Sequence, residues 1–420
     1  MVKRLVWMMV LGVMGMASCV LAVGIFNQTE DMSIQVVEAS QDRTVIQFSV
    51  SDFELVPVMH SGAVPGAVKL EMSGGALTLE PGMPDVLHVG RSVVIPDQAK
   101  MGVEVVSVSF SEYKNVELVP SKGNLSRSMN PFDVSFEKGK VYQMDAFYPG
   151  TWAELDMPYI LRDHRGQRVV FYPFQYNPVT KVLRVADELV VAVKSKGFGS
   201  VNTRSSYKPK PSREFKSLYQ QHFLNADVFA HRFDYLSDQG RMLIISHGDF
   251  LDEMQPLVDW KNRKGIPTQM VNISEIGSSS SALSSYVANY YNENGLTFLL
   301  LVGDVAQIPS PIVSGSASDP TYGFIEGGDS YAEVIVGRFS GSTPAHIVTQ
   351  VERSIEYERY PQSNGDWYDN AMGVASNQGP GWGGLSDDDF NDMLWNDILT
   401  DFTYDSYQYS YDGGGSVSQG

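Results

Sequence analysis

The acidic side chains best able to bind a ligand fall at two places in the second half of the chain. Asp304 follows the apolar run 297–302, and a glycine-rich turn with alternating carboxylates runs from Glu326 through Asp329 to Glu333. Ligands of parallel α/β sheets gather beyond the carboxyl ends of the strands, where Asp304 is expected. Calcium prefers about six to eight oxygen ligands. The turn therefore predicts either a weak calcium site or a solvated acidic turn, and its spacing is not that of an EF-hand loop.

A second acidic cluster, Asp387 to Asp389, precedes a segment with helical spacing of its apolar residues. Carboxylates at the start of a helix cap its free amides and complement its dipole, which gives the cluster a structural interpretation. The alternative is functional, with a carboxylate offered to a basic substrate side chain or to a metal.

No thiol is available in residues 23–420, because the single cysteine, Cys19, lies in the N-terminal apolar run. Disulfides, cysteine-based zinc sites and a cysteine nucleophile are thus absent from those residues. The seven histidines include no HExxH pair, and the sequence contains no GxSxG or P-loop motif. His247, before Gly248, is the one histidine at a plausible catalytic strand end, with a surface or capping role as the alternative.

The elements that must position these residues belong to a large folded chain. Its 420 residues are 43% hydrophobic and 11% aromatic, which indicates two or three domains at roughly 100–200 residues each. The formal net charge is −18. So acidic a chain offers no basic surface to phosphates, which argues against nucleic acid or anionic lipid as the main partner.

The N-terminus resembles an export signal. Lys3 and Arg4 precede an apolar run from Leu5 to Met16, and Val20-Leu21-Ala22 fits signal-peptidase cleavage after Ala22. Two alternatives are a membrane-spanning helix and lipidation at Cys19. No other stretch reaches the roughly 18 apolar residues that cross a bilayer, so we predict an exported protein without a transmembrane segment.

The remainder divides into two halves of different pattern. From about residue 30 to 200, short runs such as 44–50, 103–108 and 189–193 alternate apolar and polar residues, which predicts an all-β sandwich or barrel. From residue 241 onward, apolar strands at 242–245, 297–302, 333–337 and 371–375 alternate with helices at 281–292 and 346–360. That order predicts an α/β domain with a mainly parallel sheet covered on both faces.

Residues 201–240 lie between these halves and are rich in Lys, Arg, Ser and Pro. The segment predicts an exposed connector that offers protease sites, and a plain interdomain linker is the alternative. At the other end, residues 360–420 contain no Lys or Arg. They bring no strand or helix to finish the sheet, so we expect the α/β domain to be incomplete within this chain.

Several strings in the second half resemble the gingipain family of secreted bacterial cysteine peptidases, and three in the first half resemble its β-rich propeptide. They are, in the second half, Val258–Gly265, Leu300–Asp304 with Ile308-Pro309, Tyr322-Gly323, Asp329–Val334, Val336–Ser340 and Tyr357–Arg359, and in the first half Arg165–Gln167, Gln175–Thr180 and Leu183–Val185.

This resemblance implies a zymogen. A signal peptide (residues 1–22) would precede an inhibitory propeptide (23–200), the connector (201–240) and the N-terminal part of a caspase-like peptidase domain (241–420). Cleavage in the connector, with Arg232 at roughly the family's position, would release the peptidase. Family members use a His-Gly motif and a later Cys, in which the His assists a thiolate nucleophile. Both dyad positions would follow Gly420, so we expect this chain to be inactive and to be either a fragment or a truncated pseudo-enzyme.

The resemblance also implies binding residues. The family's first calcium site matches the side chains of Asp304, Asp329 and Glu333, with backbone oxygens of Glu326 and Tyr331. A further family ligand pair falls on Ser386 and Asn391, where both residues depart from the pattern, although Asp387 could substitute. Asp388 falls where arginine-specific members bind the substrate guanidinium, a bidentate contact that gives selectivity.

The sequence thus predicts a calcium-stabilised, exported cysteine endopeptidase zymogen, with protein or peptide substrates and its own propeptide as inhibitor. Two alternatives remain: a non-catalytic exported binding or surface protein built on the same domains, and an adhesion module anchored by lipid at Cys19.

Overall fold

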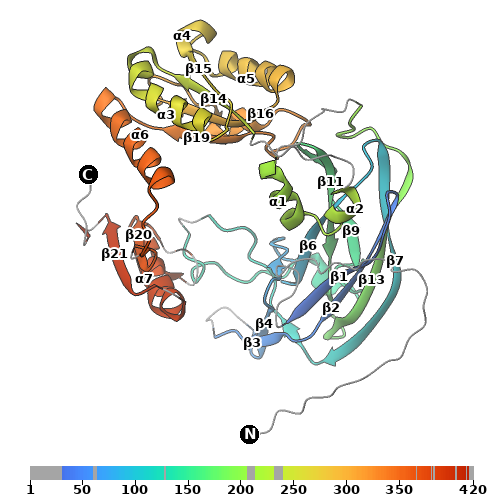
Figure 1. The fold of residues 1–420 in the computed structure, drawn as a ribbon. Coiled ribbons are helices and arrows are strands. Elements are labelled where there is room, and N and C mark those ends of the chain that lie inside the picture. The colour runs from blue at the N-terminus through green and yellow to red at the C-terminus, as the bar shows by residue number, and fades with distance from the viewer. Residues whose placement is uncertain are drawn as a thin grey trace.

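The computed structural model describes residues 31–59, 64–126, 129–205, 213–230, 240–365, 367–379, 381, 384–402, 404–412 and 414–415. We call residues 31–230 the β part and residues 240–415 the α/β part. Figure 1 shows the β part in blue and green, the parallel sheet and its helices above it in yellow and orange, and a small C-terminal unit in red.

The β part is a sandwich, as predicted. One sheet has the order β1-β2-β13-β12, with β7 paired to β13, and the other has the order β10-β11-β6-β5, with β9 paired to β11. The strands of the first sheet are Met32–Ala39 (β1), Arg43–Val50 (β2), Ala99–Lys114 (β7), Phe174–Asn177 (β12) and Val182–Phe198 (β13). Those of the second are Ala76–Leu77 (β5), Leu87–Val94 (β6), Ala153–Leu155 (β9), Tyr159–Leu161 (β10) and His164–Phe171 (β11).

Alternating apolar residues of the two sheets meet in one core. Ile46 and Phe48 of β2 and Leu189 of β13 are fully buried, and the rings of Phe48 and Phe171 stack across the sandwich with centroids 5.3 Å apart. A small third sheet, β3-β4-β8, closes one end. Its strands are Glu54–Pro57 (β3), Ala67–Glu71 (β4) and Glu117–Leu118 (β8), and a 3-10 turn, η2, follows at Lys140–Gln143.

The connector is not simply exposed, which corrects the sequence prediction. Two helices, α1 (Arg213–His222) and α2 (Ala226–Ala230), lie within residues 201–240. Phe215 and Tyr219 of α1, together with Phe223, are buried against Val94 and Tyr159 of the second sheet. Their apolar face outweighs the basic composition of the segment, so α1 belongs structurally to the β part.

The main sheet of the α/β part is parallel throughout and has the order β15-β14-β16-β19. Its strands are Arg241–Ser246 (β14), Thr268–Asn272 (β15), Leu296–Val302 (β16) and Ile335–Phe339 (β19). Its helices are Leu251–Arg263 (α3), Ile273–Ile276 (α4), Ser280–Asn294 (α5) and Pro344–Arg359 (α6), with 3-10 turns at Gly248–Phe250 (η3) and Asp319–Gly323 (η4). A two-stranded hairpin, Ile312–Val313 (β17) and Ser316–Ala317 (β18), lies before η4.

Helices cover both faces of this sheet, because successive strand residues point to opposite sides. Ile244 and Leu300 pack against α3 and α6, whereas Leu243 and Leu301 pack against α5 (Figure 1). Among the helices that the structure describes, none is long and apolar enough to cross a membrane.

The strand predicted at 371–375 exists but does not join the main sheet. It is β20 (Asn370–Ala375), which pairs in parallel with β21 (Ser406–Tyr411), and β21 continues antiparallel into β22 (Gly414–Gly415). Helix α7 (Asp387–Asp397) and the 3-10 turn η6 (Leu399–Asp401) complete this C-terminal unit. Its residues are mostly half-buried or exposed. The fold class is confirmed, with the fourth strand of the main sheet supplied by β15.

Candidate functional site

The carboxyl edge of the parallel sheet carries two of the residues that the sequence singled out. The backbone N–H of His247, after β14, donates to Val302 O at 3.1 Å, and that of Asp304, after β16, donates to Gly341 O at 3.1 Å. The Asp304 carboxylate is exposed and accepts from its neighbour Val305 N at 2.7 Å. The His247 ring accepts from Asp249 N at 3.4 Å and caps η3, which is the capping role weighed for it.

Arg338 of β19 holds this edge together. Its guanidinium donates to both carboxylate oxygens of Asp319 at 2.6 and 2.7 Å and to Ser310 Oγ at 3.0 Å. It also donates to the carbonyls of Gly303 at 2.8 Å and Ile308 at 3.0 Å. The Arg338 hydrogen bond holds the pKa of Asp319 below its ordinary value. One side chain thus fixes the turn that carries Asp304.

The acidic turn lies at the opposite, amino edge of the sheet, where the β part docks. Glu333, just before β19, is fully buried, and its carboxylate accepts from Ile325 N at 2.7 Å, Glu326 N at 2.9 Å and Arg162 N at 3.3 Å. Burial raises the pKa of Glu333 to about 7. Its oxygens are therefore already occupied by backbone donors, one of which comes from the β part.

The other predicted ligands of the turn are bonded in the same way. Asp329 accepts from Tyr331 N at 3.0 Å and from two groups of the β part, Ile160 N at 2.9 Å and Asn202 Nδ2 at 3.3 Å. The Tyr331 ring stacks on Tyr159 of β10 with centroids 3.7 Å apart. These three donors point at the two carboxylate oxygens of Asp329, which are the atoms that would bind a cation.

Glu326 also faces both parts of the chain. Its carboxylate accepts from Tyr291 OH at 3.0 Å and lies 3.8 Å from the Nε of Arg204, a side chain of the β part that is 6% exposed. The β part therefore contacts the turn at Glu326, Asp329, Tyr331 and Glu333, while Gly327, Gly328 and Ser330 are exposed.

The five residues predicted to bind calcium are not brought together in this structure. Glu333 lies beside Leu296 at the start of β16, since one Arg162 nitrogen donates to both carbonyls, whereas Asp304 follows the end of that strand. Seven residues of β16 at about 3.3 Å each place the two edges on the order of 20 Å apart. Among the described residues, no group of three or more His, Cys, Asp or Glu could hold one metal ion.

Asp388 lies in the first turn of α7, as predicted for a helix start. Ser386 is the N-cap and accepts from Asp389 N at 3.4 Å, and its hydroxyl donates to the Asp388 carboxylate. This hydrogen bond lowers the pKa of Asp388. Asp387 accepts from Ser376 Oγ at 2.6 Å. Asp388 is thus held ionised at a partly exposed helix start, which suits both its capping role and a contact with a cationic side chain.

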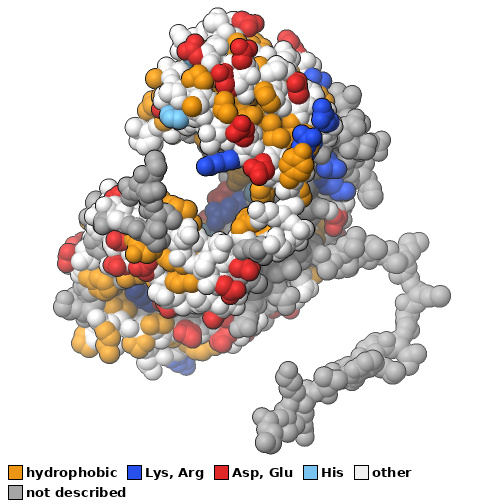
Figure 2. Space-filling view, turned by 60° about the vertical axis from the view of Figure 1, so that its left-hand side comes forward, with side chains coloured by type: hydrophobic (Ala, Val, Ile, Leu, Met, Phe, Trp, Pro, Cys, Tyr) orange, Lys and Arg blue, Asp and Glu red, His pale blue; other side chains and the backbone are white. Residues whose placement is uncertain are grey.

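A long segment of the β part reaches toward this helix. The described residues of the segment 119–139, which are 119–126 and 129–139, extend from the sandwich toward β20 and α7 (Figure 1). A Cβ placed on Gly384 would lie 2.7 Å from the Phe132 ring. Figure 2, which brings the C-terminal unit forward, shows a hollow between the body that holds the parallel sheet and the parts below it. Phe132 of this segment therefore lies beside the residues that lead into α7, two positions before its N-cap Ser386.

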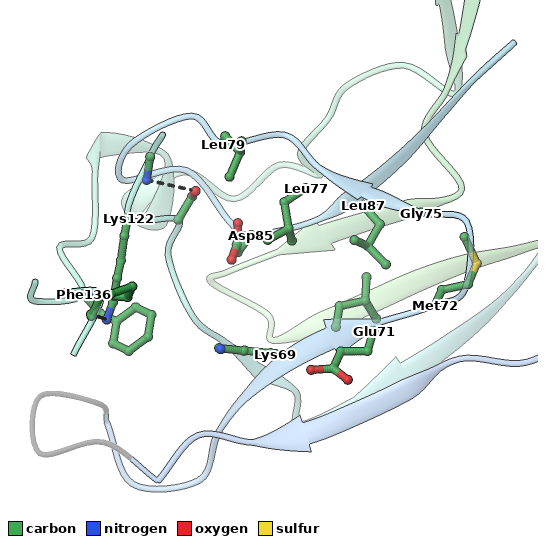
Figure 3. Close-up of a pocket in the computed structure, with 14 residues that line it drawn as sticks. Lys69, Glu71, Met72, Gly75, Leu77, Leu79, Asp85, Leu87, Lys122 and Phe136 are labelled. Atoms are coloured by element: carbon green, nitrogen blue, oxygen red, sulfur yellow. Dashed lines mark hydrogen bonds between the residues drawn. The ribbon is translucent and has the colours of Figure 1, made fainter. Parts of the chain in front are cut away.

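The base of that segment borders a cavity of about 500 Å³ in the β part. Its apolar lining includes Leu70 and Leu87, and Asp85 contributes a carboxyl group whose pKa is raised by burial. Lys122 donates to Pro131 O at 2.7 Å, and its Nζ lies 4.1 Å from the centre of the Phe136 ring (Figure 3). These contacts stiffen the base of the segment.

Two predicted site residues, Ala22 and Arg232, were assigned to cleavage, and both lie outside the described residues, as does Cys19. Conversely, the sequence reasoning missed Arg162, Asn202 and Arg338. The signals available for Arg162 were weak, since Leu161-Arg162-Asp163-His164 reads as an ordinary polar turn. Its depth of burial comes from contacts more than a hundred residues away.

Two family models match the chain in succession. Residues 27–206 match the model described as Propeptide_C25, and residues 235–418 match the model described as Peptidase family C25. Gingipain R2 of Porphyromonas gingivalis is 35% identical over 387 residues, which cover 91% of this chain and 52% of that protein. Lys-gingipain of the same organism is 25% identical over 390 residues, covering 86% of this chain and 22% of that protein.

Solved structures with similarity include the complex of Porphyromonas gingivalis RgpB pro- and mature domains. It is 37% identical, with a TM-score of 0.43, and the match covers 46% of this chain and 97% of that one. The Arg specific cysteine proteinase gingipain R is 35% identical, with a TM-score of 0.36 and 41% of each chain covered. The chain spans about half the length of Gingipain R2 and less of Lys-gingipain.

Proposed function

Because this chain belongs to peptidase family C25 and carries that family's propeptide, we propose that it is the zymogen of an exported cysteine endopeptidase. The observation that carries this proposal is the succession of the two matches, propeptide first and peptidase second, over nearly the whole chain. The contacts of the β part with the acidic turn support an intramolecular partnership between them.

The proposed nucleophile and its histidine follow Gly420, because residues 23–420 contain no cysteine and the relatives are longer. The α/β part supplies the scaffold: a parallel sheet whose carboxyl edge is fixed by Arg338. The histidine would take the proton of a thiol placed beyond this edge, and the resulting thiolate would attack the peptide carbonyl. The C–N bond would then break as the histidine passes that proton to the leaving amine, and water would hydrolyse the thioester and restore the thiol. The 420 residues alone are expected to be inactive.

Asp388 is the proposed partner of a substrate guanidinium. Its Oδ1 already accepts from Ser386 Oγ and from Asp389 N at 3.1 Å, which leaves Oδ2 as the oxygen better placed to accept from a guanidinium. The segment 119–139, with Phe132 against Gly384, would obstruct access to this helix in the zymogen. Cutting the connector near Arg232 would remove the covalent link between the β part and the α/β part, and a signal peptide ending at Ala22 would export the chain.

Calcium remains a proposal for the turn 326–333 of the separated α/β part. In the zymogen the carboxylates of Asp329 and Glu333 do not fit a cation, because backbone N–H groups of the β part, which repel cations, already point at their oxygens. Asp304 lies at the opposite edge of the sheet. No step of the proposed function depends on calcium.

The test compares the 420-residue chain with the product of the gene read in frame past the codon for Gly420. We expect only the longer chain, once cut in the connector, to hydrolyse fluorogenic peptides with Arg before the scissile bond, and thiol alkylation to abolish that activity. A D388A variant of the longer chain should lose the Arg preference. Hydrolysis by the 420-residue chain would contradict the thiol mechanism, and a stop codon after Gly420 would favour the binding-protein alternative.

A further inference from the structure

The β part inserts one tight turn into the α/β part. Strands β10 and β11 form a hairpin in which Leu161 pairs with His164, so that Arg162 and Asp163 make a two-residue turn. Both turn residues are almost fully buried, Arg162 at 3% and Asp163 at 4% exposed. Hairpin tips normally lie at the surface, and the burial of a charged tip indicates that it is designed to fit a receptor.

The guanidinium of Arg162 binds the starts of two neighbouring strands of the other part. Nη1 donates to Leu296 O at 2.7 Å and also to Glu333 O, and Nη2 donates to Thr297 Oγ1 at 3.4 Å. Leu296 and Thr297 begin β16, and Glu333 lies two residues before Ile335, the first residue of β19. Because β16 and β19 are adjacent and parallel, this one side chain joins them where β19 enters the sheet.

Aromatic rings close over the same guanidinium from both parts. Its carbon lies 4.7 Å from the ring centre of Phe215 of α1 and 5.4 Å from that of Tyr291 of α5. Cation–π contacts strengthen when the cation is desolvated. Asp163 supports the turn from behind, because it accepts from Tyr219 OH at 2.5 Å and lies 3.8 Å from Arg162 Nε.

The backbone of Arg162 is held in a conformation that favours glycine, with φ at +47°. A residue other than glycine keeps such a backbone conformation only when the surrounding contacts compensate for its strain. The consequence here is geometric: the turn directs the Arg162 N–H to the Glu333 carboxylate while its side chain reaches the strand carbonyls.

We propose that the turn Arg162–Asp163 is the anchor that holds the β part on the α/β part, and that the turn 325–333 with the starts of β16 and β19 is its receptor. Holding and blocking are then separate tasks. The anchor binds the amino edge of the sheet, and Phe132 of the segment 119–139 lies beside the residues that lead into α7. The inference rests on the proposed function only in identifying the β part as a propeptide.

A consequence is that cutting the connector does not by itself release the β part. To test this, residues 233–238 of the full chain are replaced by the recognition sequence of a specific protease, and the cut chain is analysed by gel filtration and by analytical ultracentrifugation over a dilution series. We expect the two wild-type pieces to co-elute. In Arg162→Ala the dissociation constant should rise by about 30-fold or more, since removing one partner of a buried charged contact costs roughly 2–5 kcal/mol.

Arg168→Ala is the matched control. Arg168 lies on β11, the strand that follows the turn; its side chain is 38% exposed and pairs with Asp156 of the β part at 3.1 Å. It should leave the dissociation constant unchanged. Because Arg162→Ala could impair folding, Tyr331→Ala provides a second variant on the receptor side; loss of its stack on Tyr159 should raise the dissociation constant about 2- to 12-fold.

Dissociation constants of both variants within twofold of Arg168→Ala would overturn the anchor and assign attachment to the segment 119–139 or to α1. Separation of the wild-type pieces on cutting would overturn it as well. The measurement requires no peptidase activity and no residue beyond Gly420. The proposed enzymatic function can therefore fail while the anchor stands, and the reverse also holds.

Discussion

Replacing Arg338 by alanine should loosen the carboxyl edge of the parallel sheet without affecting the sandwich. The substitution removes donors to the Asp319 carboxylate, to Ser310 Oγ and to the carbonyls of Gly303 and Ile308. The Arg338 side chain is 10% exposed and that of Asp319 is 23% exposed, so the carboxylate that remains is only partly rescued by water. Breaking a buried pair from one side costs about 3–5 kcal/mol, and partial exposure places the expected loss at about 3 kcal/mol.

The two parts of the chain can unfold separately, so a single unfolding midpoint is a poor measure. Hydrogen exchange by mass spectrometry reads each part independently. A loss of about 3 kcal/mol corresponds to roughly 100-fold faster exchange of the slowest amides in β16 and β19, with peptides from β2 and β13 as an internal reference. The exchange rate in Arg338→Lys should fall between those of the wild type and Arg338→Ala, because lysine keeps the charge but lacks the planar fork of donors.

The control is Arg263→Ala, at the exposed C-terminal end of α3, which should change exchange by less than threefold. A double variant with Asp319→Asn separates the ion pair from the carbonyl contacts. If amides of β16 and β19 exchange at the same rate in Arg338→Ala as in Arg263→Ala, Arg338 does not stabilise the carboxyl edge of the sheet. Faster exchange spread equally into β2 and β13 would refute its local character.

Three further outcomes are expected. Burial lowers the pKa of His222, whose ring hydrogen-bonds Tyr159 OH at 2.6 Å. The stability contributed by the neutral ring is complete above its unfolded pKa of about 6.5 and is lost as pH falls through the lowered value, so the β part should unfold in less urea near pH 5.5 than near pH 7.5, a difference that His222→Gln should reduce. Gly166→Ala should destabilise the β part by about 1–3 kcal/mol in urea unfolding, because the new Cβ would lie 2.6 Å from Tyr159 and 2.7 Å from Phe223, whereas Gly150→Ala meets nothing within 4 Å and should be neutral. In thermal denaturation, calcium should leave the melting temperature of the intact chain unchanged and should raise the melting temperature of the isolated α/β part. A calcium-dependent rise in the intact chain that Asp329→Asn removes would instead support the calcium site predicted from the sequence.

The periodic features of the fold were predictable from the sequence because each depends on neighbours along the chain. The alternating runs became β2, β7 and β13, and the apolar runs became β14 and β16. The boundaries of α5 follow from local chemistry, since Ser279 caps its start by accepting from Ala282 N and Gly295 ends it at a φ of +73°. The helix start at Asp387 was predicted for the same reason.

Features that depend on distant partners were not predictable in this way. Strand 371–375 was assigned to the main sheet, but its pairing with β21 is a choice between partners that periodicity does not distinguish. The basic composition of 201–240 predicted an exposed connector and concealed the apolar face of α1. The acidic turn illustrates the same limit, because Asp329 and Glu333 meet donors from residues 160–202 rather than Asp304.

The family strings had roles that their composition did not reveal. Glu358, in the string Tyr357–Arg359, accepts from Trp260 Nε1 at 2.8 Å, Lys261 Nζ at 2.5 Å and Lys264 Nζ at 2.9 Å of the string Val258–Gly265. Two matched strings nearly a hundred residues apart thus form one contact between α3 and α6. They report architecture rather than catalysis, which explains how the resemblance could be recognised in a chain without its nucleophile.

The buried turn at Arg162 also bears on which β part a given α/β part can accept. A guanidinium that enters a closed pocket must find its carbonyl acceptors there, because a buried charge without partners is heavily penalised. A foreign partner with a different residue at this turn, or a receptor with a differently shaped strand entry, would be rejected rather than merely bound less well. The hairpin and the strand starts that it contacts are therefore expected to be transferable between homologous chains only as a matched pair.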